Sequence, residues 1–193
     1  ADMLVCMTAA AMKTDKIHLG TGVIIPSNRL APVAASAIAS LNAIAGGRIH
    51  MGVGTGFTGR RTMGLGPIKL ADMFDWIEVV EKLLAGKTVD AQIEGAKRTV
   101  RFMNPELELI NITDRVPITV SALGPRGRRM VAERGYAWTN TVGNLERAEV
   151  AIADMKAAWK EAGRDLSELL ATANCGGTVL AKPDDWDLSL IPI

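Results

Sequence analysis

One stretch of this chain is rich in glycine, so that a ligand could approach its backbone. Residues 49–59, Ile-His-Met-Gly-Val-Gly-Thr-Gly-Phe-Thr-Gly, pass from a short apolar strand straight into a loop with four glycines in eight residues. Glycine at this density costs backbone entropy, so it marks a tight turn or a backbone that another group approaches closely. At the carboxyl end of a parallel strand that group is typically a ligand. The stretch therefore predicts a binding loop.

A second stretch combines glycines with arginines. Residues 121–128, Ser-Ala-Leu-Gly-Pro-Arg-Gly-Arg, follow a predicted strand and open a predicted helix. Gly124 and Gly127 leave backbone N–H groups accessible at the helix start, where the helix dipole favours an anion. Arg126 or Arg128 could add a charged, bidentate contact. The alternative is an ordinary helix start with solvated arginines.

Strands and helices that alternate along the chain must position these loops. Strand patterns repeat five times and most are separated by helical patterns, which predicts a parallel sheet, either doubly wound or closed as a barrel. The weakly alternating residues 87–115 predict a hairpin excursion. Predicted strands are 17–22, 49–53, 117–121, 136–140 and 171–181, and predicted helices are 3–13, 32–45, 69–85, about 125–134 and 144–162.

Composition excludes several classes of protein. The 193 residues are 48% hydrophobic and 22% charged, with a formal net charge of +1, so nothing favours nucleic acid or an anionic membrane surface. Cys6 and Cys175 lie far apart, without metal-ligand spacing, which predicts no metal site and a cytoplasmic location. No apolar run approaches the ~18 residues of a membrane helix.

A dinucleotide-binding loop is the competing interpretation. Residues 54–59 match G-x-G-x-x-G and follow a strand. That fold also needs a helix opening at the loop and an acidic residue ~20 positions later, at the end of the next strand. Residues 64–67 predict irregular chain instead, and Asp72 and Asp75 fall within a helical pattern. The sequence therefore disfavours an NAD-binding Rossmann oxidoreductase.

Three blocks of sequence together resemble the bacterial-luciferase-like family of flavin- and deazaflavin-dependent oxidoreductases, which includes methylenetetrahydromethanopterin reductase. The blocks are LGTGVIIPSNRLAP at 19–32, LNAIAGGRIHMGVGTGF at 41–57 and PITVSALGPRG at 117–127. Their order and spacing agree with the family, and the resemblance covers most of residues 1–181. It implies an α/β protein of the (β/α)8 TIM-barrel type, with FMN or the deazaflavin coenzyme F420 at the carboxyl ends of the strands. Residues 182–193 remain an unassigned tail.

The resemblance also implies particular cofactor-binding residues. Thr21, Gly22 and Val23 would form the family's strand bulge behind the flavin ring, with a cis peptide bond between Gly22 and Val23. Thr55 and Gly56 would line the neighbouring rim, although some relatives carry Arg where this chain has Thr55; Arg60 or Arg61 could substitute. The phosphate-binding turn would comprise residues of the second glycine stretch, namely Ser121, Gly124, Arg126, Gly127 and Arg128.

Other residues have plainer interpretations. Trp138, on a predicted strand, could flank the flavin ring or pack in the core. His18 and His50 should be packed or hydrogen-bonded on the strands. The Met and Trp stripe over residues 73–80 fits core packing.

The expected function is therefore a flavin- or deazaflavin-dependent oxidoreductase, either a monooxygenase or a hydride-transfer enzyme, acting on a small organic substrate as a homo-oligomer. The alternative is a flavin-binding relative without catalysis. No catalytic acid or base can be assigned, because no segment matches the first two strands of the family. A (β/α)8 barrel typically needs ~250 residues, so we expect this chain to be a piece of a longer protein, holding the third to the seventh strand.

Overall fold

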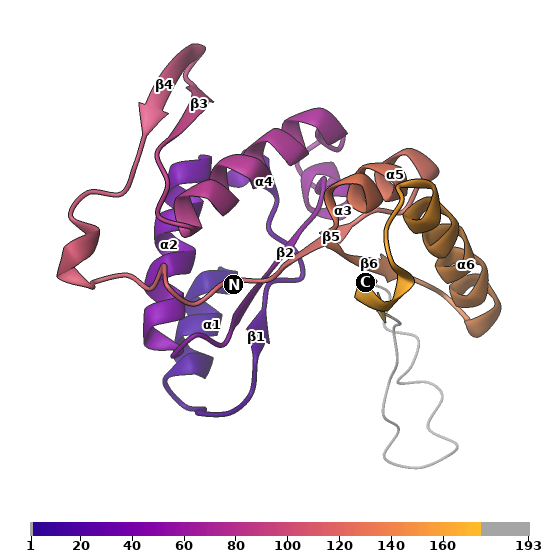
Figure 1. Cartoon of the computed structure of the whole chain (residues 1–193), viewed down its shortest axis with the longest axis horizontal. Helices are drawn as coiled ribbons and strands as arrows, with labels where there is room; N and C mark the ends of the chain where they lie inside the picture. Colours follow the sequence, from indigo (N-terminus) through magenta and orange to yellow (C-terminus); the bar gives the residue numbers. More distant parts are fainter. Residues whose placement is uncertain (1, 175–193) are drawn as a thin grey trace. The chain divides into compact units, whose positions relative to one another are not determined.

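The computed structural model describes residues 2–174, which fall into two units (Figure 1). The first unit is Ala1–Ala122 and the second is Leu123–Ile193. Cys175, the end of the strand predicted at 171–181, and the tail 182–193 lie outside the described residues. Within residues 2–174, no helix has both the length and the apolar character needed to cross a membrane.

The sheet of the first unit consists of three parallel strands with β2 in the centre. β1 (Leu19–Gly20) pairs with β2 (Ile49–Val53), and β2 pairs on its other side with β5 (Ile118–Ser121). Registers Leu19↔Ile49 and Met51↔Ile118 fix the alignment. The alternate side chains of Ile49, Met51 and Val53 are fully buried, as expected for a strand covered by helices.

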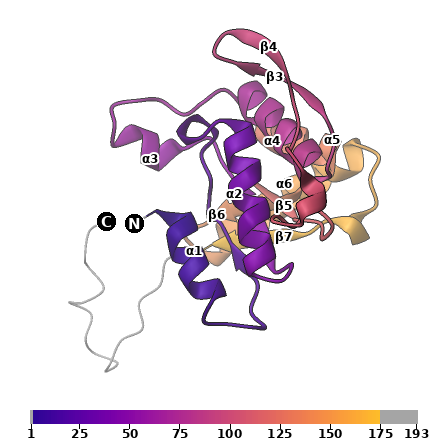
Figure 2. The same cartoon turned by 90° about the vertical axis from the view of Figure 1, so that its left-hand side faces the viewer.

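Three long helices supply the core of this unit: α1 (Met3–Ala11), α2 (Ala31–Ile44) and α4 (Leu70–Leu84) (Figure 2). α2 packs against both α1 and α4. Because α2 is rich in alanine, its neighbours approach it closely, and four of its alanines are buried. The stripe on α4 is buried core, as the sequence predicts, and comprises Met73, Trp76, Ile77, Val80 and Leu84.

Arg48 ties the chain between α1 and β1 to the end of α2. Its guanidinium donates hydrogen bonds to backbone carbonyl oxygens of Ala11, Thr14, Ile17 and Ala45, and to the Thr14 hydroxyl. A planar guanidinium offers five N–H donors in a fixed fork, which a lysine ammonium does not. Arg48 therefore holds the entry to the first strand in place.

The glycine loop after β2 differs from the sequence prediction. Residues 57–61 form a short helix, α3 (Phe57–Arg61), that the sequence does not predict, whereas residues 64–67 are irregular, as predicted. Gly56, in the left-handed conformation with φ of 79°, caps its start, and Gly59 lies inside it. A helix does open at the loop, contrary to the expectation, but it has five residues and ends before the irregular chain. The other argument against a dinucleotide fold holds, because Asp72 and Asp75 lie on α4 and not at the end of a strand.

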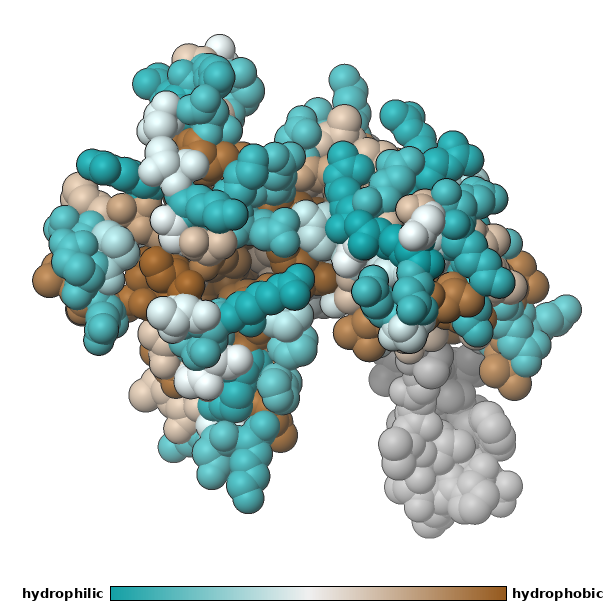
Figure 3. Space-filling model, in the orientation of Figure 1, coloured by the Kyte–Doolittle hydropathy of each residue, from teal (hydrophilic) through white to brown (hydrophobic). Residues whose placement is uncertain are grey.

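The predicted excursion is a two-stranded hairpin. β3 (Val89–Ile93) pairs antiparallel with β4 (Ala96–Val100), and the turn residues Glu94 and Gly95 both have positive φ, 53° and 75°. Two adjacent residues of positive φ are typical of the tight turns that match the twist of a hairpin. The hairpin extends beyond α4 (Figure 1), and on the face in Figure 3 it is mostly hydrophilic. A short 3-10 turn, η2 (Pro105–Leu107), follows it.

The second unit alternates helix and strand. Its elements are α5 (Pro125–Arg134), β6 (Ala137–Thr141), α6 (Leu145–Glu161), η3 (Leu166–Glu168) and β7 (Ala171–Asn174). β6 and β7 are parallel, with Trp138 opposite Ala171. α5 packs against α6, whose Met155 and Trp159 are buried. The described residues thus contain five parallel strands in the two units, at the five predicted places; β1, with two residues, is shorter than the predicted 17–22.

Candidate functional site

The carboxyl end of β1 carries the predicted bulge. The peptide bond between Gly22 and Val23 is cis, which confirms the prediction. The Thr21 hydroxyl donates to the Gly52 carbonyl and accepts from the Gly52 N–H, both at 2.8 Å. After the cis bond the chain returns to β2, where Ile24 forms an isolated bridge with Val53. The bulge is therefore anchored to β2 on both sides.

Glycines of β2 make room for this bulge. A Cβ at residue 52 would collide with the backbone carbonyl oxygen of Thr21, and a Cβ at residue 54 would lie 2.8 Å from Cγ2 of Val23. The same position lies 3.4 Å from the Cβ of Ser121, at the end of β5. The structure therefore brings Val23, Gly54 and Ser121 together at the ends of three adjacent strands.

Gly22 faces unfilled space. A Cβ built on this residue would meet no heavy atom of the described chain within 4 Å. No residue among 2–174 thus requires a glycine there for lack of room, in contrast to residues 52 and 54. A flat ring placed against the bulge would use that space, so the residues at these strand ends fit a flavin or deazaflavin.

The rim after β2 is built from backbone contacts. Thr55 accepts a hydrogen bond from Ile68 through its carbonyl oxygen at 3.0 Å. Arg60 donates to the Ser27 hydroxyl and to the Gly66 carbonyl, each at 2.6 Å. Arg60 therefore holds two loops together, and its guanidinium already has partners within the chain. Of the two arginines considered as substitutes at this rim, Arg61 lies over the Phe57 ring, 6.0 Å from its centroid.

In the second unit, the predicted phosphate-binding turn does open a helix. Gly124 is the N-cap residue of α5 and accepts a hydrogen bond from Arg128 N–H, and a Cβ on Gly124 would meet nothing within 4 Å. Gly127 is buried in the first turn. Arg126 is exposed, and no partner for its guanidinium exists in the described part of the chain. This start of α5 fits an anion.

Arg128 has a different position from Arg126. Its guanidinium is nearly buried and donates to the Leu123 carbonyl at 2.7 Å and to Asp154 of α6 at 2.8 Å. It thereby joins the start of α5 to α6. The sequence could not reveal this pairing, because the two residues are 26 positions apart.

The two arginines should therefore respond differently to mutation. Arg128→Ala is expected to lower the free energy of unfolding by about 1–2 kcal/mol, because it removes hydrogen bonds to a half-exposed carboxylate and a carbonyl. Arg126→Ala should leave stability within about 0.5 kcal/mol but weaken FMN about tenfold more than riboflavin, through loss of a charge-assisted phosphate contact. Urea unfolding and equilibrium dialysis measure the two effects. Equal losses of affinity for FMN and for riboflavin would show that Arg126 does not contact the phosphate.

Trp138 is 3% exposed. Side chains alternate along a strand, so Trp138 shares a face of β6 with Asn140, and Asn140 lines a cavity whose other walls come from α5 and α6. Of the two interpretations that the sequence left open for Trp138, this position supports packing in the core.

His18 and His50 are hydrogen-bonded, as predicted. Nδ1 of His18 lies 3.0 Å from Nε2 of His50, and the rings meet edge to face. Burial, together with the neighbouring His18, lowers the pKa of His50 below its usual 6.5. His50 lies opposite Gly20, and its backbone carbonyl oxygen accepts a hydrogen bond from the Thr21 N–H at 3.3 Å.

A lowered pKa of a histidine makes stability depend on pH. The unfolded chain protonates His50 near pH 6.5, while the folded chain resists protonation, so the unfolded state binds more protons and stability falls as the pH falls. Well above pH 6.5, His50 is neutral in both states and its contribution to the free energy of unfolding is constant. We expect the urea midpoint to decrease between about pH 7.5 and about pH 5, with a shallower decrease in His50→Gln. Identical pH profiles for the two proteins would contradict this assignment.

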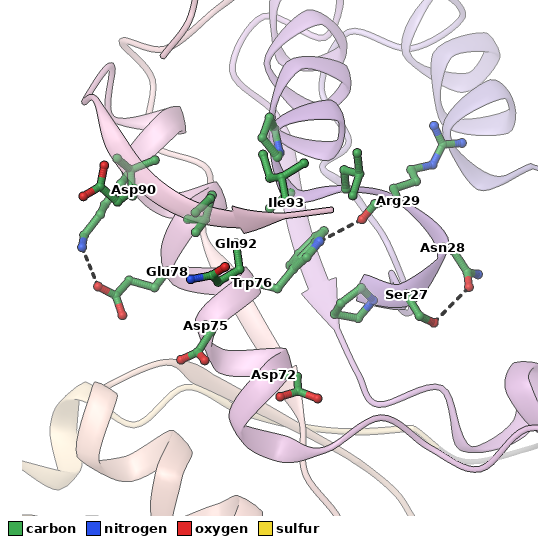
Figure 4. Close-up of a pocket in the computed structure, with 18 residues that line it drawn as sticks. Ser27, Asn28, Arg29, Asp72, Asp75, Trp76, Glu78, Asp90, Gln92 and Ile93 are labelled. Carbon is green, nitrogen blue, oxygen red and sulfur yellow. Dashed lines mark hydrogen bonds and ion pairs between the residues drawn. The ribbon is translucent and has the colours of Figure 1, made fainter. Parts of the chain in front are cut away.

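A cavity of about 790 Å³ lies elsewhere in the first unit and was not foreseen from the sequence. Its walls come from the loop of η1 (Pro26–Asn28), from α4 and from β3. In Figure 4, the Trp76 indole points to the Arg29 carbonyl, which accepts its N–H at 2.9 Å, while Asp72 and Asp75 lie along one side. None of the predicted cofactor residues lines this cavity, so we assign it no part in cofactor binding.

The parallel strands alternating with helices, and the strand-end bulge, are those of a (β/α)-barrel protein. Residues 1–185 match the family model of the luciferase-like monooxygenases, and the chain belongs to that family. A solved relative, the coenzyme F420-dependent tetrahydromethanopterin reductase from Methanopyrus kandleri, superposes with a TM-score of 0.76 at 27% identity, covering 90% of this chain and 54% of the relative. The expected TIM-barrel type is thereby confirmed.

Two further relatives are similar in sequence. The 5,10-methylenetetrahydromethanopterin reductase of Methanolobus tindarius is 32% identical over 175 residues, which is 87% of this chain and 50% of the relative. The limonene 1,2-monooxygenase of Rhodococcus erythropolis is 30% identical over 191 residues, or 95% of this chain and 44% of the relative. The chain thus spans about half the length of these relatives.

Proposed function

We propose that this chain belongs to an oxidoreductase that uses F420 or FMN, with hydride transfer between F420 and a small organic substrate as the leading activity. Two similar proteins support the choice of F420. One is a methylenetetrahydromethanopterin reductase and the other is named as dependent on coenzyme F420. We further propose that the protein acts as a homo-oligomer in the cytoplasm.

One observation carries the proposal. Gly22 and Val23 follow the carboxyl end of β1, with space beside Gly22 that no described residue fills and with Gly54 and Ser121, at the ends of β2 and β5, close to Val23. Ligands of parallel α/β proteins bind at this end of the strands. This position supports the binding of a tricyclic ring against Gly22 and Val23.

The residues of this chain would act by binding and orienting the cofactor. The Thr21 hydroxyl is fully engaged with Gly52, so it fixes the shape of the bulge. Backbone N–H groups at the start of α5, with Arg126, would bind the cofactor's phosphate. The bound cofactor supplies or accepts the hydride. At the described strand ends of the first unit, Thr21, Gly22, Val23, Thr55, Gly56 and Ser121 carry no carboxyl or imidazole group, so we assign them no acid or base role.

A second candidate is a monooxygenase that uses reduced FMN and oxygen. The limonene 1,2-monooxygenase relative, which matches 95% of this chain, favours it. A deazaflavin does not activate oxygen readily, so the identity of the bound cofactor distinguishes the two candidates.

Cofactor titration tests both candidates on the purified protein. We expect a tighter dissociation constant for F420 than for FMN, followed under anaerobic conditions by absorbance, and reduction of bound F420 by an oxidisable substrate such as a secondary alcohol or sugar phosphate. Tighter binding of FMN, with oxygen consumption, would favour the monooxygenase. Binding of either cofactor without turnover, in a protein containing all eight strands, would show a non-catalytic relative. Failure to bind either would refute the proposal.

A further inference from the structure

A small cavity in the second unit is lined by hydrogen-bond donors. It measures about 370 Å³ and lies where the start of α5, the end of β6 and the first turns of α6 meet. All of its walls belong to residues 123–154, within one unit. Its lining residues are Leu123, Arg128, Asn140, Glu146, Arg147, Val150, Ala151 and Asp154.

Asn140 is the unexplained member of this lining. It is 8% exposed, and its carboxamide has no hydrogen-bond partner among residues 2–174. No side-chain nitrogen or oxygen in the described chain is both fully buried and unpaired, so the carboxamide of Asn140 reaches the open space of the cavity. A ligand in the cavity can therefore form hydrogen bonds with this carboxamide.

Charges around the cavity indicate the class of ligand. Arg128 already balances Asp154, but only two of the five N–H donors of a guanidinium are used in that pair and in the bond to Leu123. Arg147, in the first turn of α6, has no acid partner in the described part of the chain. The positive end of the α6 dipole lies at the same place. Opposing these donors is the exposed carboxylate of Glu146.

We infer that this cavity is an oxyanion subsite in which Asn140 and Arg147 bind a phosphate or carboxylate, with Arg128 fixed as its wall. The inference rests on the proposed function in one respect only: the anion is an acidic group of the substrate or, in place of the contact with Arg126, the cofactor's phosphate. In both cases the chemistry that recognises it is the same, a carboxamide N–H and a guanidinium acting on a small oxyanion.

Titration with inorganic phosphate tests the subsite directly, whether or not a flavin binds. Asn140→Leu and Arg147→Gln should each weaken phosphate about tenfold. Glu146→Gln should tighten it about two- to threefold, because a like charge is removed. Lys156→Gln is the matched control, since Lys156 is exposed on the same helix and outside the cavity; it should bind phosphate as the wild type does.

Asn140→Asp is a second variant that tests the subsite if Asn140→Leu does not fold. It keeps the shape of the side chain but adds a negative charge, so it should abolish phosphate binding while the thermal midpoint stays near that of the wild type. Weakening by Lys156→Gln equal to that by Arg147→Gln would show an adventitious ion only and would overturn the inference. Unchanged binding in both Asn140 variants would also overturn it.

A second titration identifies the source of the anion. The subsite holds the cofactor's phosphate if Asn140→Leu and Arg147→Gln weaken the binding of FMN or F420 without weakening that of riboflavin or a phosphate-free deazaflavin. If the two variants bind inorganic phosphate more weakly but bind the cofactors as the wild type does, the subsite holds an acidic group of the substrate. A protein that binds phosphate here but no flavin or deazaflavin would refute the proposed function and leave the subsite standing.

Discussion

Replacement of Gly52 by alanine should destabilise the protein by roughly 3 kcal/mol. The added methyl group would collide with the carbonyl oxygen of Thr21, which belongs to the backbone and cannot rotate away. Relief requires β1 to separate from β2, and that movement also breaks the two hydrogen bonds between the Thr21 hydroxyl and Gly52. Urea unfolding followed by circular dichroism measures the loss.

Gly20→Ala is the matched control, because Gly20 lies on the partner strand, next to Thr21. A Cβ there would have its nearest contact 3.6 Å away, at the Cβ of His50, which is ordinary van der Waals distance. Its stability should stay within about 1 kcal/mol of the wild type, since alanine also restricts the unfolded chain. Similar losses in both variants would mean that the close approach at residue 52 does not determine the strand geometry.

Replacement of Gly22 by leucine should abolish cofactor binding. A Cβ at Gly22 would meet no described heavy atom within 4 Å, so we expect the fold to accept the leucine, whereas a ring bound against the bulge would be displaced. We expect FMN and F420 to bind at least about a hundredfold more weakly, which corresponds to roughly 2.7 kcal/mol. Fluorescence titration measures this loss, and the urea midpoint reports whether the fold persists.

Gly124→Ala provides the comparison for that variant. Its Cβ would also meet nothing within 4 Å, but Gly124 caps α5 and is expected to contact the phosphate, not the ring. Its effect should therefore be larger on FMN than on riboflavin, whereas Gly22→Leu should weaken both equally. Unchanged binding of riboflavin by Gly22→Leu would place the ring elsewhere.

Local patterns in the sequence were sufficient for most of the fold. The apolar spacing on α4 predicted a helix at 69–85, and the structure has one at Leu70–Leu84. Strand 49–53 agrees residue for residue with β2. These elements are long and strongly periodic, or bounded by glycines, so local preference and tertiary packing favour the same structure.

Features set by distant contacts could not be predicted. α3 contains Gly59 and has no buried residue, so its sequence shows no apolar periodicity. It is stabilised by the left-handed Gly56 at its start and by the hydrogen bonds of Arg60 to Ser27 and Gly66. The pairing of Arg128 with Asp154 depends on the packing of α5 on α6. In contrast, the cis bond at Gly22 was predicted by family resemblance, because no local propensity signals it.

The hairpin of β3 and β4 has a consequence for how such a protein can vary. Its register is fixed by its own turn at Glu94 and Gly95, and nearly all of β4 is exposed. Arg98 places positive charge on β4, whose only strand partner among the described residues is β3, and such a charge discourages strands of other molecules from adding there. Insertions or deletions at the tip of the hairpin would therefore leave the three-stranded sheet and its glycine contacts unchanged. The hairpin is thus a place where related proteins can differ in length without a change at the proposed cofactor site.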